Sequence, residues 1–100
     1  MQTELNMTDN RKLDLLFELL EKAENLAKQY TGGYSSHFQS AEEFHAALTE
    51  SISKLKAGDM RQIESLWLWF LPSYDWDDFI RDDREQLANP ISEILSELKQ

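Results

Sequence analysis

The sequence predicts an all-α fold, either a compact four-helix bundle or an irregular helical array, built by a single domain over residues 1–100. The composition is helical, because Leu, Glu, Ala and Lys are abundant, Val is absent, and only 3 Gly and 2 Pro interrupt the chain. Apolar residues also recur at steps of three and four along four segments. That spacing is typical of helices that bury one face.

The first predicted helix runs over residues 9–30, with Thr8 or Asp9 as its cap and the glycines of "TGG" as its end. A loop follows. Ser40 then opens the second helix, with Glu43 at capping-box spacing, and Gly58 ends it. The inward faces of these two helices are predicted to consist of Leu13, Leu16, Phe17, Leu20, Ala23, Ala27, Tyr30, Phe44, Leu48, Ile52 and Leu55.

The third predicted helix begins at Asp59, which can cap it, and ends before Pro72, because proline cannot continue a helix. Its inward face is predicted to hold Ile63, Leu66, Trp67 and Phe70. Asp75 and Asp78 then resemble another N-cap pair, which opens a short turn through Trp76, Phe79 and Ile80.

The last predicted helix carries one apolar stripe that keeps its phase across Pro90. We therefore expect one helix kinked at Pro90, the alternative being a separate helix capped by Asn89. The core is predicted to bring together side chains from all four main helices, namely Leu16, Leu20, Leu48, Ile52, Trp67, Leu95 and Leu98.

The charge and the cysteine count limit the classes of function. A net charge of -9 disfavours nucleic acid and anionic membranes as partners and favours a basic protein. Without cysteine there are no disulfides or thiolate metal sites, which suits a cytoplasmic protein. We expect no secretory signal, because the first residues contain no apolar h-region, and no apolar run in the sequence is long enough to span a membrane.

Aromatic and acidic residues alternate just after the third predicted helix. Six acids and two arginines between Asp75 and Glu85 give this stretch a local charge of -4. Tryptophan and tyrosine are enriched at binding hot spots, and surrounding acids would steer a cationic partner. The alternative is a structural helix start, in which acids suit the N-terminal dipole. The predicted partner-binding residues are Tyr74, Asp75, Trp76, Asp77, Asp78, Asp82 and Asp83.

Other functions find less support in the residues. Glu42 and His45 have the Glu-x-x-His spacing of di-iron bundles, but the chain lacks a second such pair, so we expect no metal site and no cofactor. A small metal-dependent hydrolase using Glu42, Glu43 and the aspartates remains an alternative. A helical homo-oligomer that associates through its Trp69 face is another. Nucleophilic catalysis lacks its parts, so no catalytic residues are predicted.

The stretch "WFLPSYDWDDF…LANPISEIL" resembles small bacterial helical proteins with a Pro-[Ser/Thr]-x-x-Trp-Asp-Asp sequence before their last helix. Size, acidity and helix number also resemble the immunity proteins of nuclease bacteriocins, in which an acidic, tyrosine-bearing surface binds the toxin. The nearest counterpart here is Pro72 to Asp78, without the paired tyrosines of that family. The expected function is therefore a non-catalytic, cytoplasmic inhibitor or immunity-type protein, a monomer or weak homodimer, that occludes a basic partner such as a toxin nuclease.

Overall fold

The computed structural model describes residues 2–35, 37–80 and 83–99, and helices are the only regular elements in these ranges, which confirms the predicted all-α class. A short π-helical turn, η1, leads directly into the last helix. The elements in chain order are α1 (Gln2–Ala27), α2 (Ala41–Lys56), α3 (Gln62–Phe70), α4 (Asp75–Phe79), η1 (Arg84–Ala88) and α5 (Asn89–Lys99).

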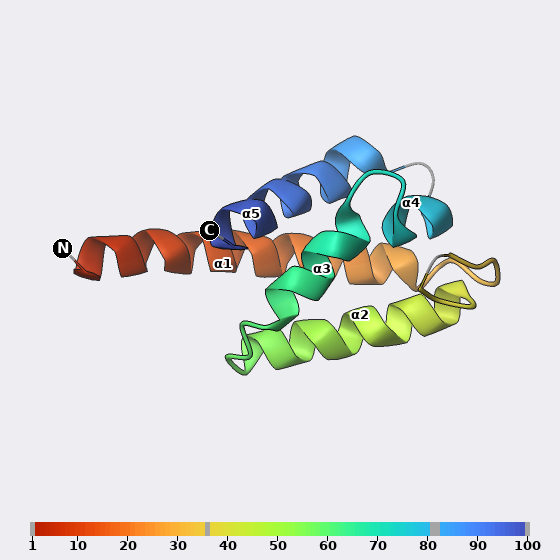
Figure 1. Ribbon diagram of the computed structural model, residues 1–100, viewed down its shortest axis with the longest axis horizontal. Coiled ribbons are helices and arrows are strands. Elements are labelled where there is room, and N and C mark those ends of the chain that lie inside the picture. Colours follow the sequence, from red (N-terminus) through yellow and green to blue (C-terminus); the bar gives the residue numbers. More distant parts are fainter. Residues whose placement is uncertain (1, 36, 81–82, 100) are drawn as a thin grey trace.

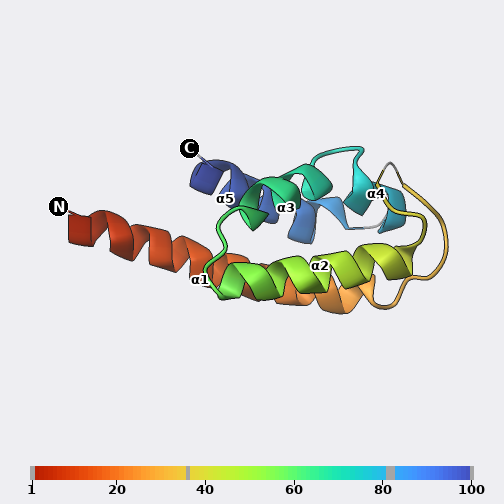
Figure 2. The same ribbon diagram turned by 60° about the horizontal axis from the view of Figure 1, so that its bottom comes forward.

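The main helices form two layers. α1 and α2 lie side by side in one layer, and α3 and α5 form the other (Figure 2). The loop between α1 and α2, the start of α2, and α4 gather at one end of the molecule, and the start of α1 projects at the other (Figure 1). The molecule measures 48 × 25 × 20 Å. In Figure 1 its longest axis is horizontal, and this loop and α4 lie at one end of that axis.

The core lies between these layers. Five of the seven residues predicted for it are buried: Leu16, Leu20, Leu48, Ile52 and Leu95. Trp67 and Leu98 pack against the core but are only partly buried, so the prediction was too strong for these two. The ammonium of Lys99 lies 4.4 Å from the centre of the Trp67 ring and covers the outer face of the indole.

The structure shifts both ends of the first predicted helix. α1 begins at Gln2 rather than near Thr8, because residues 2–27 contain no glycine or proline and are mostly good helix formers. It ends at Ala27, where the N–H groups of Gln29 and Tyr30 donate to carbonyls only three residues back. The glycines at 32 and 33, both with positive φ, therefore turn the following loop instead of capping the helix.

The predicted cap of α2 is formed with one change of partner, whereas the N-cap position of α3 falls on Arg61, without a side-chain cap hydrogen bond, and not on Asp59 as predicted. The Ser40 hydroxyl accepts from the N–H of Glu43 at 3.1 Å, but the Glu43 carboxylate reaches back to the N–H of Gln39 rather than to Ser40. The Asp59 carboxylate accepts from the N–H of Arg61 at 3.1 Å, and α3 begins one residue later. Local spacing thus places both helix starts to within a few residues.

Near Pro90, where we expected a kink, the structure shows a change from π-helix to α-helix. Backbone winding continues from Arg84 to Lys99 and changes from π to α at Asn89. Proline lacks an N–H, and within a regular α-helix its ring would collide with the carbonyl four residues earlier, here that of Gln86. The wider π turn at that position accommodates the proline without ending the helix.

Candidate functional site

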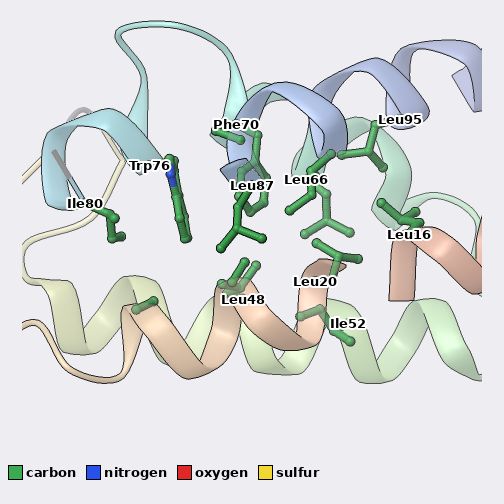
Figure 3. Packing of buried hydrophobic residues seen from close by; sticks show 14 of the residues in the cluster. Leu16, Leu20, Leu48, Ile52, Leu66, Phe70, Trp76, Ile80, Leu87 and Leu95 are labelled. Carbon is green, nitrogen blue, oxygen red and sulfur yellow. The ribbon is translucent and has the colours of Figure 1, made fainter. Parts of the chain in front are cut away.

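The structure overturns the prediction that Trp76 is an exposed anchor. Trp76 is 0% exposed, and its indole ring lies 4.9 Å from that of Phe70 and 6.3 Å from that of Phe44, centre to centre. Its ring nitrogen donates to the main-chain carbonyl of Asp83 at 3.1 Å. Figure 3 shows the indole pointing from α4 into the core. Trp76 therefore fixes α4 to the core and cannot contact a partner.

Asp75 is likewise buried, although we predicted it among the partner-binding residues. Its carboxylate is 0% exposed and is held by the loop between α1 and α2. Oδ1 accepts from the Ser35 hydroxyl at 2.5 Å and from the main-chain N–H of His37 at 3.2 Å, while Oδ2 lies 2.7 Å from Nδ1 of His37. These three donors compensate for the hydration that the carboxylate loses when it is buried.

The remaining predicted site residues divide between surface and interior. Asp78 is exposed, Tyr74 is 38% exposed, and Asp77 is half-buried, with its carboxylate accepting from the N–H of Ser73 at 2.7 Å. Asp83 is buried at 7% exposure, so it does not belong to a surface site either.

Three residues from the same stretch cannot be placed. Asp82 and Arg81 lie outside the described residues, as does the side chain of Arg84. Whether Arg81 and Arg84 neutralise the neighbouring acids, which would make the acidic stretch structural, therefore stays untested.

A different surface emerges at this end of the molecule. Tyr34 is 82% exposed and directly precedes Ser35, and Tyr74 directly precedes Asp75. The hydrogen bond between Ser35 and Asp75 thus brings two exposed tyrosines within one residue of a shared contact. We call the surface made by Tyr34, His37, Tyr74, Asp77 and Asp78 the tyrosine–acid end. The loop and α4, which carry it, lie at the same end of the molecule in both views (Figures 1 and 2) and are joined by the contacts of Asp75.

The loop that carries Tyr34 and His37 is anchored on both sides of these residues. The Glu42 carboxylate accepts from the N–H of Gly32 at 2.9 Å, and this hydrogen bond lowers the pKa of Glu42 from its usual value. Phe38 packs edge-to-face on Phe44 and on Trp69, each at a ring distance of 5.3 Å. The loop is therefore held by polar contacts at its ends and by aromatic packing beneath it.

The packing of Trp69 also bears on the homo-oligomer alternative. This side chain is half-buried and contacts both Phe38 and Phe44, with the Phe44 ring at 6.1 Å. Much of the face that we considered for self-association is thus used to support the loop within one chain.

The two segments that build the tyrosine–acid end are acidic in sequence. Residues 31–43 and 71–80, which build it, contain five acids and neither lysine nor arginine. One of the five, Asp75, is internal, and a second, Glu42, holds the loop. The others add negative charge to the segments that carry the two exposed phenol rings, which favours a cationic group as the ligand.

The Glu42 and His45 pair of the metal hypothesis is used structurally. Nε2 of His45 lies 2.8 Å from the Glu24 carboxylate on α1, and Glu42 contacts Gly32 as described. Within the described residues no group of three or more potential ligands is placed to hold a metal ion. A groove of about 380 Å³ runs between α1 and α2 near this pair, lined by Glu21, Glu24, Asn25, Thr49, Ile52, Ser53 and Lys56.

Sequence reasoning missed Tyr34 and His37, since nothing in their local spacing links residues 34–38 to α4. The inward position of Trp76 did leave a signal, because Trp76, Phe79 and Ile80 follow a three-and-four spacing that marks one buried helical face.

No protein-family model matches the chain, and comparison with curated proteins and with solved structures gives no match either. Among the described residues, no helix combines the length and the apolar character that crossing a membrane requires.

Proposed function

We propose that this protein is a non-catalytic binding module, an acidic inhibitor or immunity-type protein that occludes a basic partner such as a toxin nuclease. The observation that carries the proposal is the pairing of two exposed tyrosines, Tyr34 and Tyr74, on segments joined through Asp75 and free of lysine and arginine. Such a module would act in the cytoplasm, in keeping with a chain that has no cysteine.

The tyrosines would supply the apolar contact area. A phenol ring has a large, rigid face and loses little side-chain entropy on binding, which is why tyrosine is frequent at binding hot spots. The tyrosine–acid end replaces the predicted site centred on Trp76. Of that site, Tyr74, Asp77 and Asp78 are retained.

The acids would act mainly on the rate of association. Asp77, which is half-buried, and Asp78, which is exposed, both lie in α4, and their negative charge would attract a basic partner over distances of about 8–10 Å in physiological salt. Occlusion then follows from the position of the surface, because a bound partner would be covered by both the loop and α4.

Capture from extracts of cells that make the protein, followed by affinity measurement on the purified partner, would test this. We expect the wild type to retain a basic protein, and Tyr34→Ala with Tyr74→Ala to weaken its binding by about 2–4 kcal/mol. Met60→Ala is the matched control, because Met60 is 50% exposed but lies between α2 and α3, at the far end of α2. Equal affinity of both variants for the same partner would refute the proposal.

A second pair of variants separates charge from contact. Asp77→Asn with Asp78→Asn keeps an acceptor oxygen for Ser73 and should slow association and flatten its salt dependence. Glu18→Gln with Glu93→Gln, at exposed residues of α1 and α5, removes the same two charges elsewhere and is the control for charge alone. Association rates that change equally in both cases would show that only the net charge matters.

A further inference from the structure

The two histidines of the chain pair with carboxylates through opposite ring nitrogens. His37 approaches Asp75 with Nδ1, at 2.7 Å from Oδ2, whereas His45 approaches Glu24 with Nε2, at 2.8 Å from Oε2. In a neutral imidazole one nitrogen donates and the other accepts, so the partner of one nitrogen decides the role of the other. The two rings are therefore expected to be opposite tautomers.

The buried carboxylate fixes His37 in a particular role. Asp75 is fully buried and accepts from the Ser35 hydroxyl and the His37 N–H, so it requires a donor at Nδ1 of the ring as well. With the proton on Nδ1, the lone pair lies on Nε2, on the opposite side of a side chain that is 42% exposed. When neutral, this imidazole therefore presents a hydrogen-bond acceptor at Nε2.

We infer that His37 is a contact residue of the tyrosine–acid end and that its Nε2 accepts a hydrogen bond from an arginine side chain of the partner. The inference rests on the proposed function and deepens it, since it names the group that the site recognises. Asp75, which does not contact the partner, is the positioning residue.

Arginine fits this surface better than lysine. Its planar guanidinium can donate to Nε2 while its face lies on a phenol ring, and Tyr34 is three residues from His37 on the same loop. The nearby acids offset the positive charge, and residues 31–43 and 71–80 contribute no competing cation.

The tautomers can be measured on the intact protein. Imidazole ¹⁵N chemical shifts at pH about 8, where an ordinary histidine is neutral, should report a proton on Nδ1 of His37 and on Nε2 of His45. His37→Gln and His45→Gln assign the two signals. A proton on Nε2 of His37 would overturn the inference, because that nitrogen could then no longer accept.

Titration with a hexa-arginine peptide tests the recognition step, with hexa-citrulline as the uncharged, isosteric control. At about 0.15 M salt, we expect hexa-arginine to shift the Nε2 resonance of His37 and not that of His45. His37→Gln should weaken binding about tenfold or more, which corresponds to one charge-assisted hydrogen bond, and His45→Gln should leave it unchanged. An equal loss in both variants, or an equal response to both peptides, would overturn the inference.

The outcomes separate this inference from the proposed function. If partner capture depends on Tyr34 and Tyr74 but not on His37, only the role of His37 fails. If capture is indifferent to the tyrosines, the proposed function fails even where the tautomer is as expected. Asp75→Asn should change the His37 tautomer populations. Because Asp75 is buried, its substitution could prevent folding. In that case the test rests on His37→Gln, which changes an exposed residue.

Discussion

The indole N–H of Trp76 donates to the main-chain carbonyl of Asp83 across 3.1 Å, within a fully buried side-chain environment. We expect Trp76→Phe, which keeps an aromatic ring but leaves this carbonyl without its donor, to lower the free energy of unfolding by about 1–3 kcal/mol. Trp76→Ala should cost about 3–5 kcal/mol, because it also leaves a cavity. Urea unfolding followed by circular dichroism measures both. Trp69→Phe, at a half-buried ring, is the control, and an equal loss there would contradict the special position of Trp76.

Trp67 should contribute less to stability than a fully buried side chain of α3 would. The ring is half-buried beneath the Lys99 ammonium, so Trp67→Ala should cost about 2–3 kcal/mol, close to the value of burying one large side chain. A double-mutant cycle with Lys99→Met should give a coupling of about 0.5–1 kcal/mol from the cation–π contact. A coupling of zero would show that the ammonium does not stabilise the ring.

Asp59 should make stability depend on pH in acid. The hydrogen bond from Arg61 and that from Gln62 lower the pKa of Asp59 from 3.8 to about 2. A carboxylate whose pKa is lower in the folded state stabilises the fold above its unfolded pKa, and this contribution is lost as the pH falls through the folded pKa. Between these two values the wild type should therefore lose stability more steeply than Asp59→Asn. The free energy of unfolding of both proteins is measured by urea unfolding at each pH in this range. If it falls equally with pH in the wild type and in Asp59→Asn, the lowered pKa of Asp59 is contradicted.

His45 and Glu42 should not bind a divalent ion. A metal on this pair would have to displace the Glu24 contact of His45 and the Gly32 contact of Glu42. Calorimetry with Zn²⁺, Mn²⁺ and Fe²⁺ should therefore give no stoichiometric heat in the micromolar range. A response that disappears in His45→Ala would prove this prediction wrong.

The parts of the fold that the sequence predicts are those governed by local spacing. Ser40 caps α2 as expected because its partner is three residues away. The stripe through Leu16 and Leu20 lies inward because a helix of seven turns repeats its period often enough to be recognised. The late start assigned to α1 was wrong because Thr8 and Asp9, although good caps, are also tolerated within a helix.

The site is less predictable, because it depends on contacts between distant residues. Asp75 meets Ser35 and His37 across 40 and 38 positions of sequence, and no periodic pattern encodes such a contact. Charge alone favoured a surface position for Asp75, but three donors from one loop allow its carboxylate to be buried. The five residues of α4 are also too few for a full apolar repeat, so the acids around Trp76 outweighed its spacing to Phe79 in our prediction.

The shortness of α4 has a consequence for the order in which the chain folds. A helix of five residues is too short to be stable alone, because nucleation fixes several residues before it gains a single hydrogen bond. α4 gains its partners only when Trp76 enters the core and Asp75 meets a loop that lies some forty residues earlier. We therefore expect α4 to form after the two helical layers have assembled, and its amides to exchange with solvent through local opening well before those of α2. The loop between α1 and α2, together with α4, would then open and close as one cooperative unit. The contacts of Asp75 with Ser35 and His37 would form and break together.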